Sequence, residues 1–403
     1  MLHLHDQTRR RIALAAFFAL GIVPTAMIGA WCVLRQGPWD AWAESQRLGR
    51  QLGMDVALGT LRHPRPGRVV YEGLRLSDPE TGQEVLRTAL LEATWTVAVD
   101  GRGRRPAVVL AAPQVEVEID GTGRLWQILQ QNLRLQCGRP EIEVRVKVDE
   151  LVIRGGEHPL ALAHVEGGIG ALSGGVQAVA SFHLAGRAAA APVRARLVRN
   201  RQLRPPADSI ELDTAGTPLP CPLLALAVPG AAWLDPSSRF AGSIASRQTA
   251  GGWEGEVSGQ CLGIDLDRLV SDHFPYRLSG PADLTIRRAR FRDGRLDEAE
   301  AMLAAGPGVI DRRLLDAAAA QLRLSGALPQ TPAGGLVPYD QLSVGITLDA
   351  RGLWLQGLCQ NAEPGTILRA GQVRLLGEPQ SQPQPVTASI RALLPAGGEA
   401  VMR

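Results

Sequence analysis

The chain has 403 residues, of which 45% are hydrophobic and only 4% aromatic, so aliphatic side chains must build any large core. Its formal net charge of +3 is too close to neutral to indicate a nucleic-acid partner. The single lysine, Lys147, stands between Val146 and Val148, which excludes a phosphate-binding loop of the Gly-Lys-Ser/Thr type.

The first feature along the chain is an uncharged apolar run at residues 12–34. Three arginines come directly before it: Arg9, Arg10 and Arg11. A membrane-spanning helix needs about 20 apolar residues, and flanking arginines favour the cytoplasmic side. We therefore predict a transmembrane helix at 12–34, a cytoplasmic stub at 1–11, and the rest of the chain outside the cytoplasm. A cleaved signal peptide is the alternative, but its apolar core would span about 7 to 15 residues.

Tryptophans lie near the end of the predicted span and just beyond it, at Trp31, Trp39 and Trp42. Tryptophan is enriched where the bilayer meets water. Residues 35–53 therefore predict a short juxtamembrane helix lying at the membrane surface. A simple linker helix is the alternative.

After residue 54 the apolar pattern changes to a period of two. It is cleanest from Ile142 to Val148, where apolar residues alternate with Glu143, Arg145 and Lys147. Such alternation places apolar side chains on one face of a strand and charges on the other. Similar runs continue over the predicted β-regions 54–200 and 208–377, before an extended tail at 378–403.

Three patches with helical spacing interrupt the strands, at 125–133, 262–273 and 309–322. Within the second, Asp265 and Asp267 fit the start of a helix better than a metal-binding loop. Roughly eighteen strands at about 4.8 Å each would extend about 85 Å. Open sheets rarely exceed about ten strands. The predicted fold is therefore mostly β: a long antiparallel sheet curled into a groove or solenoid, as one domain or as two divided near 200–208.

Catalytic and metal-binding motifs are weak, so the chain is not predicted to be an enzyme or to need a cofactor or metal. His158 and His164 lack the i, i+4 spacing of a helical zinc site. Glu116 and Glu118 imitate a glycosidase pair, but the flanking valines favour the solvated face of an amphipathic strand. An envelope hydrolase is therefore the least favoured interpretation.

The cysteines carry no recognisable spacing motif. Cys32 lies in the predicted span, and the other four are scattered: Cys137, Cys221, Cys261 and Cys359. A compartment outside the cytoplasm would permit disulfides. Four cysteines allow three full pairings, among which sequence cannot choose, and unpaired thiols are equally consistent with it.

The order of these elements resembles the AsmA-like family of bacterial envelope proteins, related to TamB and the chorein-type lipid-transfer proteins. The similar segments are the end of the first helix at 52–56, a strand and Asp-Pro turn at 69–79, an Ala-Pro strand at 112–120, a Gly-x-x-Trp helix at 123–129, and the closing strands at 339–376. The resemblance implies a single-pass inner-membrane protein whose periplasmic β-sheet handles phospholipids and supports outer-membrane integrity.

An apolar groove of this kind needs a continuous aliphatic lining. The lining we predict consists of Val115, Val117, Ile119, Ile142, Val144, Val146 and Val148. Two alternatives remain open. These residues form an ordinary closed core, or the chain is a non-enzymatic periplasmic scaffold that binds envelope protein partners through exposed sheet edges.

Overall fold

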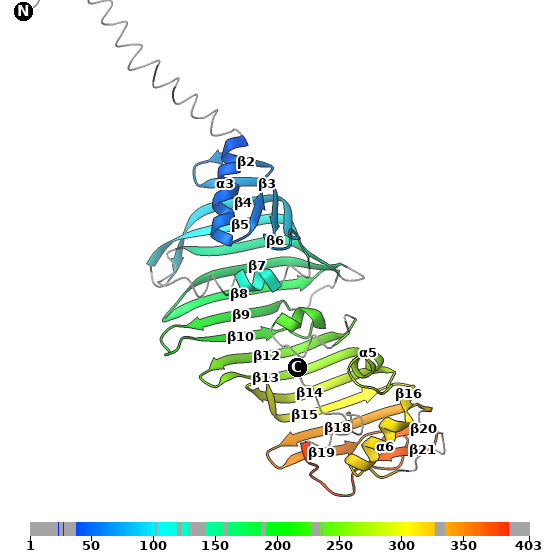
Figure 1. The fold of residues 1–403 in the computed structure, drawn as a ribbon. Helices are drawn as coiled ribbons and strands as arrows, with labels where there is room; N and C mark the ends of the chain where they lie inside the picture. Colours follow the sequence, from blue (N-terminus) through cyan, green and yellow to red (C-terminus); the bar gives the residue numbers. More distant parts are fainter. Residues whose placement is uncertain are drawn as a thin grey trace, which may run out of the picture. The chain divides into compact units, whose positions relative to one another are not determined.

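The computed structural model describes residues 23, 27, 38–100, 103–118, 123–128, 130, 142–155, 159–186, 191–226, 234–235, 237–326 and 335–386. The described chain is mostly β with a few short helices, as the sequence predicts (Figure 1). It forms two compact units, Met1–Gly168 (unit 1) and Ile169–Arg403 (unit 2).

The predicted N-terminal membrane anchor falls almost entirely outside the described residues. Among those that are described, no helix is long and apolar enough to span a bilayer. Only Val23 and Met27 of the predicted span are described, and Arg9, Arg10, Arg11 and Trp31 are not, so the anchor stays a prediction.

The predicted juxtamembrane helix is present in unit 1 as α3 (Pro38–Leu52). Its Ala41 and Ser45 are buried, whereas Trp42 is 62% exposed. One face of α3 therefore packs against the unit, and Trp42 lies on a face left open to its surroundings. Trp39 lies within the same helix.

Unit 1 contains a mixed sheet. Its strands are β1 (Asp55–Ala57), β2 (Thr60–Arg65), β3 (Arg68–Ser77), β4 (Glu84–Asp100), β5 (Gly103–Glu118), β6 (Glu143–Arg154) and β7 (Leu160–Leu172), which continues past Gly168. Both β1 and β2 pair antiparallel with β3, and β3 with β4 and β4 with β5 likewise. β5 and β6 run parallel, with Ala107 opposite Glu143 and Glu118 opposite Arg154.

The parallel pair corrects the prediction of a wholly antiparallel sheet. Parallel neighbours need a connection of about a dozen residues or more, usually with a helix in it, to return the chain to the same end of the sheet. The connection from Glu118 to Glu143 is long enough and contains the helix at 123–128. The helix was predicted, but its consequence for strand direction was not.

Unit 2 contains an antiparallel sheet. Its strands are β8 (Gly175–Leu184), β9 (Val193–Asn200), β10 (Ala207–Asp213), β11 (Leu219–Pro220), β12 (Arg239–Thr249), β13 (Gly252–Asp265), β14 (Pro281–Arg292), β15 (Arg295–Ala305), β18 (Gln341–Asp349), β19 (Gly352–Gly357), β20 (Thr366–Ala370) and β21 (Val373–Gly377). Strands from β8 to β15 pair in chain order, except that β10 and β11 both pair with β12. β15 then pairs with β18, which also contacts β19 and β20, and β21 pairs with β20.

Smaller elements accompany this sheet. Strands β16 (Gly308–Asp311) and β17 (Leu336–Tyr339) form a separate pair, and the helices are η2 (Cys221–Leu226), α5 (Leu266–Ser271) and α6 (Arg312–Gln321). In each unit the described pairings leave the sheet open, and the predicted curling into a groove or solenoid is not found among the described strands. Residues 201–206, near which a division was considered, join the paired strands β9 and β10 inside unit 2.

The helices α5 and α6 are shorter than their apolar spacing predicts, because the preceding residues belong to strands. β13 runs through Asp265 and β16 through Asp311. Each aspartate then caps the helix that follows: its side chain accepts a hydrogen bond from the backbone N–H of Asp267 or Arg313, at 2.9 and 2.8 Å. The prediction that Asp265 marks a helix start is confirmed.

Candidate functional site

One face of the unit 1 sheet is apolar across three neighbouring strands. Six side chains form two rows across β4, β5 and β6: Trp95, Val108 and Val144 in one, and Ala93, Leu110 and Val146 in the next. Because these residues lie directly opposite one another, they share a face. The predicted lining residues Val144 and Val146 thus stand beside apolar residues of β4 and β5.

Toward one end, this face is covered by the chain itself. Val115, Val117 and Val148 are buried, and they pack with Leu125 of the helix at 123–128. This helix comes from the connection between the parallel strands, so the crossover that sets strand direction also covers the sheet. Three of the predicted lining residues are therefore buried in a hydrophobic core cluster.

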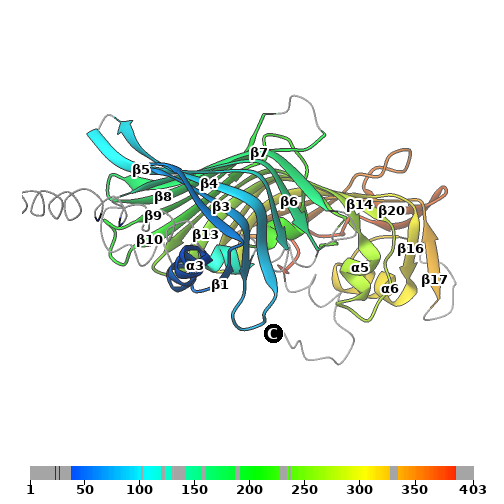
Figure 2. The same cartoon turned by 90° about the horizontal axis from the view of Figure 1, so that it is seen from above.

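Toward the other end, the face is open. Trp95 is 45% exposed and Val97 60% exposed on β4, while Val144 and Val146 on β6 are partly buried. β3 ends its pairing with β4 at Thr94, so Trp95 and Val97 lie where β4 has passed its neighbour (Figure 2). The hairpin of β4 and β5 extends beyond the adjacent strands, which leaves its apolar side chains uncovered.

Two predicted lining residues are not part of this arrangement. Ile142 is 45% exposed and precedes β6, which begins at Glu143. Ile119 lies outside the described residues. Conversely, Trp95 and Leu110 belong to the face but were not among the predicted lining residues. The alternation of Trp95 and Val97 with threonines could have indicated them, because it matches the alternation in β6.

The opposite face of unit 1 carries charges that are paired. Glu116 forms ion pairs with Arg87 at 2.5 Å and with Arg154 at 2.8 Å, and these arginines lie on the two strands beside its own. Lys147 pairs with Glu166 at 3.0 Å. The hydrogen bond to Glu116 raises the pKa of the Arg87 guanidinium above its usual range. Glu116 therefore lies between two arginines of the neighbouring strands.

The unit 2 sheet separates its faces in the same way. Cys261, Leu284, Leu303 and Val344 lie opposite one another on β13, β14, β15 and β18. The helices α5, α6 and η2 cover part of this face through Leu266, Val270, Leu314, Leu315 and Leu224, all buried. This apolar face also carries a polar exception, a partly buried ion pair between Arg199 and Asp208 at 2.8 Å.

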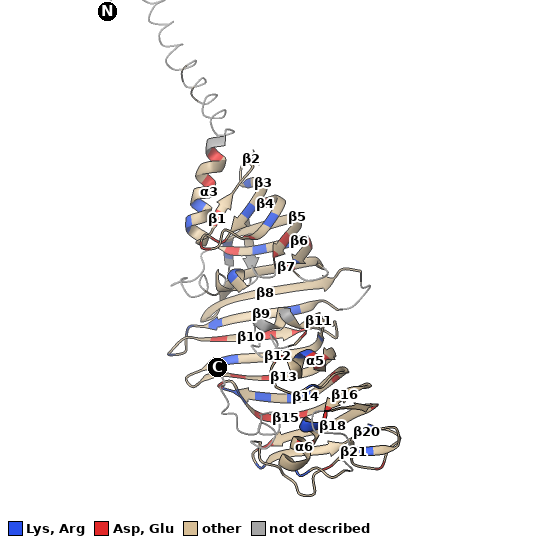
Figure 3. Ribbon diagram, turned by 45° about the vertical axis from the view of Figure 1, so that its right-hand side comes forward, with Lys and Arg blue, Asp and Glu red and all other residues tan. Residues whose placement is uncertain are grey.

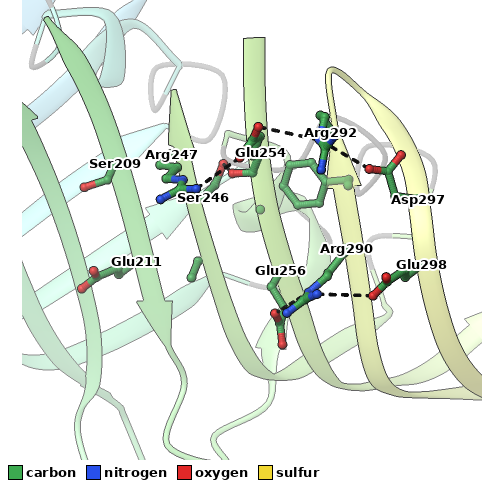
Figure 4. A pocket seen from close by; sticks show the side chains of 13 residues that line it. Ser209, Glu211, Ser246, Arg247, Glu254, Glu256, Arg290, Arg292, Asp297 and Glu298 are labelled. Atoms are coloured by element: carbon green, nitrogen blue, oxygen red, sulfur yellow. Dashed lines mark hydrogen bonds and ion pairs between the residues drawn. The ribbon is translucent and has the colours of Figure 1, made fainter. Parts of the chain in front are cut away.

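A hollow of about 510 Å³ lies on the charged side of unit 2, over β10 and β12–β15 (Figure 4). Arg290 contacts Glu256 at 3.2 Å and Glu298 at 3.4 Å, and Arg292 lies between Glu254 and Asp297. These side chains are largely exposed, and exposed pairs of this kind contribute about 0–1 kcal/mol each. Charged residues follow β14 and β15 in rows (Figure 3). The lining has five acidic side chains and three arginines, so the hollow is a solvated surface with a small excess of negative charge.

Metal-binding geometry is not found in the described part of the chain, where no three His, Cys, Asp or Glu side chains gather to hold an ion. His164 lies on β7 with a φ of 51°, while His158 falls outside the described residues. The feature that stands out is therefore the amphipathic division of each sheet, with the uncovered apolar end in unit 1.

Comparisons with family models, curated proteins and solved structures find no match to this chain. The resemblance to AsmA-like proteins therefore remains a prediction from the sequence motifs.

Proposed function

We propose that this chain is a membrane-anchored, AsmA-like protein of the bacterial envelope that shields or moves phospholipids along the apolar face of its β-sheet. The anchor at 12–34 would hold it in the inner membrane, with both β-regions in the periplasm, where it would support outer-membrane integrity. Sequence supplies the anchor and the family resemblance. The uncovered apolar end in unit 1 supplies the surface.

The observation that carries the proposal is the continuation of one apolar face from a covered core to an open end. Val148 is buried under the chain's own helix, whereas Val146 on the same strand is partly buried against that core and Val144 is also only partly buried. Trp95, in the same row as Val144, is exposed. An acyl chain laid on such a strip gains about 0.8 kcal/mol for each methylene removed from water. Specific ligand contacts are not required, which suits lipids that differ in headgroup.

The strand β6 offers a matched test, because neighbouring residues face opposite sides. A photoreactive amino acid such as benzoylphenylalanine would be placed at Val146 or at Lys147 in the full chain, expressed in its native membrane. We expect lipid adducts from position 146 and none above background from position 147, as measured by mass spectrometry. Val146→Asp should remove lipid that co-purifies with the full chain while preserving its fold.

Equal lipid labelling from both positions would show that the contact is non-specific, and protein-only adducts from position 146 would show that the face is covered. Either result overturns the proposal. Unfolding of the Val146→Asp variant would likewise place Val146 in a closed core.

The scaffold alternative depends on an exposed sheet edge. In the described structure β2 pairs with β3 alone, and most of its residues are exposed. Yet Arg62, Pro64 and Arg65 lie on it, and proline and charge are the features that keep edge strands from pairing with other chains. This edge is therefore a poor site for adding a partner strand, and we favour the lipid-handling function.

A further inference from the structure

Two cysteines far apart in the sequence meet in the core of unit 2. Cys221 is fully buried and Cys261 is 6% exposed, and both belong to the cluster formed by Phe240, Leu224 and their neighbours. Each thiol shifts the pKa of the other, raising that of Cys221 and lowering that of Cys261, as expected of neighbouring side chains. Sequence alone left the three possible pairings open, and the fold brings these two together.

The backbone places both thiols there. Cys221 follows β11 directly, and its N–H donates to the carbonyl oxygen of Ser238 at 2.9 Å, just before β12 begins. Phe240 of β12 pairs with Cys261 of the next strand, β13. Cys221 therefore lies at the start of η2, which covers part of the apolar face of the sheet, and Cys261 lies on that face.

We propose that Cys221 and Cys261 form a disulfide in the mature protein, which fixes η2 to β13. The inference rests on the proposed location outside the cytoplasm, since disulfides persist in oxidising compartments. The bond would close the chain between η2 and β13 into a loop and hold the helix over the sheet's apolar face.

Formation of this bond requires a disulfide donor, either a protein disulfide or a small-molecule one such as oxidised glutathione. The thiolate of one cysteine attacks the donor disulfide and releases one donor thiol. The second thiolate then attacks the mixed disulfide and releases the other donor thiol. Two cysteine thiols are oxidised, and one donor disulfide is reduced to two thiols.

The timing follows from burial. The interaction between the two thiols, together with burial, raises the pKa of the Cys221 thiol, whereas the same interaction lowers the pKa of Cys261. Both side chains are buried, and a buried pair is out of reach of a disulfide donor. Exchange therefore belongs to the folding chain, before β11 and η2 settle on the sheet.

Cys359 provides an internal control. Its thiol donates to the carbonyl oxygen of Ile367 at 3.1 Å, on a different part of unit 2, and it belongs to neither half of the pair. Burial raises the pKa of this thiol as well. We expect Cys359 to remain a thiol under conditions that oxidise Cys221 and Cys261.

Peptide mapping tests the pairing directly. The full chain would be extracted from membranes with free thiols blocked by N-ethylmaleimide, and digested with trypsin without reduction. We expect the peptide of residues 202–239 linked to that of residues 248–268, and the peptide of residues 352–369 carrying the blocking group on Cys359. Reduction should lower the melting temperature by about 10 °C, as expected for a loop of this length. Cys359→Ser should leave that shift unchanged, and Cys261→Ser should abolish it.

A second arm separates this inference from the proposed location. Reduced full chain would be unfolded and refolded in detergent with oxidised glutathione, where the fold alone decides which cysteines pair. Linkage of either cysteine to Cys137, or blocked thiols at both positions after refolding, overturns the disulfide. Linkage after refolding but not in the extracted protein would show that the fold can pair the two cysteines. It would also show that the protein does not mature in an oxidising compartment. Protease added outside the cytoplasm reports that location independently.

Discussion

At the scale of single residues, Asp311 both caps the start of α6 and forms an ion pair there. Its buried carboxylate accepts from the backbone N–H of Arg313 at 2.8 Å and pairs with the Arg313 guanidinium at 2.7 Å. Removal of a helix cap of this kind costs about 1–2 kcal/mol. We expect Asp311→Ala to lower the free energy of unfolding by that amount, as measured by urea denaturation.

The matched control lies on the same helix. Asp316 pairs with Arg312 at 2.8 Å but is about half exposed. An exposed pair four residues apart contributes about 0.3–0.5 kcal/mol, so Asp316→Ala should change the free energy of unfolding by no more than that. A loss from Asp316→Ala as large as that from Asp311→Ala would show that helix propensity, rather than the cap, controls α6.

The Asp311 contribution should also depend on pH. The hydrogen bond from the Arg313 side chain holds the pKa of this carboxyl below its usual value, against the opposing effect of burial. A group whose pKa is lower when folded stabilises the protein fully above its unfolded pKa, about 3.9 for aspartate. That stability is lost as the pH falls through the folded pKa. The difference between wild type and Asp311→Ala should be largest at pH 7 and shrink below pH 4, and a constant difference would contradict the electrostatic account.

At the scale of elements, the apolar positions of β5 change phase within the strand. Val108, Leu110 and Ala112 lie opposite Val144, Val146 and Val148, and beyond Pro113 the apolar face continues at Val115 and Val117. Period-two reasoning found Val115 and Val117 but not Val108 or Leu110. It could not tell which apolar residues are covered, because the cover is a helix packed from elsewhere in the chain.

This difference in cover predicts opposite responses to the same substitution. Val148→Asp places a carboxylate in the core beneath Leu125, and an unpaired buried charge costs several kcal/mol or is neutralised by protonation. We expect it to unfold unit 1. Val97→Asp lies 60% exposed on the open end of β4 and should change stability by about 0.5 kcal/mol or less.

Circular dichroism and urea denaturation of the full-length variants would distinguish the two. If Val97→Asp destabilises the chain as strongly as Val148→Asp does, the end of β4 is covered in solution and the exposed apolar strip does not exist. If Val148→Asp is tolerated, the helix at 123–128 does not cover the sheet.

Much of the element order could be read from the sequence, but pairing could not. The Trp39–Gly53 region, the Ile142–Val148 strand and the cap at Asp265 were all recognisable, because each depends on neighbours along the chain. The parallel pairing of β5 with β6 and the meeting of Cys221 with Cys261 depend on contacts between distant segments. A local pattern is the same whichever strand lies beside it, so these features needed the fold.

At the scale of the whole molecule, the proposed function depends on the anchor. A helix over residues 12–34 rises about 1.5 Å per residue and would cross a hydrocarbon core of about 30 Å. Arginine near the centre of such a helix costs about 2.5–3.5 kcal/mol per residue on insertion. We expect the double variant Phe18→Arg and Leu20→Arg to move the full chain from the membrane fraction to the soluble fraction after alkaline carbonate extraction.

Leu34→Arg is the matched control, because it adds the same charge beside Arg35 at the end of the predicted span, where the side chain can reach the headgroups. This variant should stay with the membrane. An intact mass that begins after residue 34 would instead show a cleaved signal peptide, and release of the wild-type chain by carbonate would show that no helix holds it. In both cases the apolar face of unit 1 would have to collect lipid as a soluble carrier, so the anchor decides between a fixed site at the inner membrane and a mobile one.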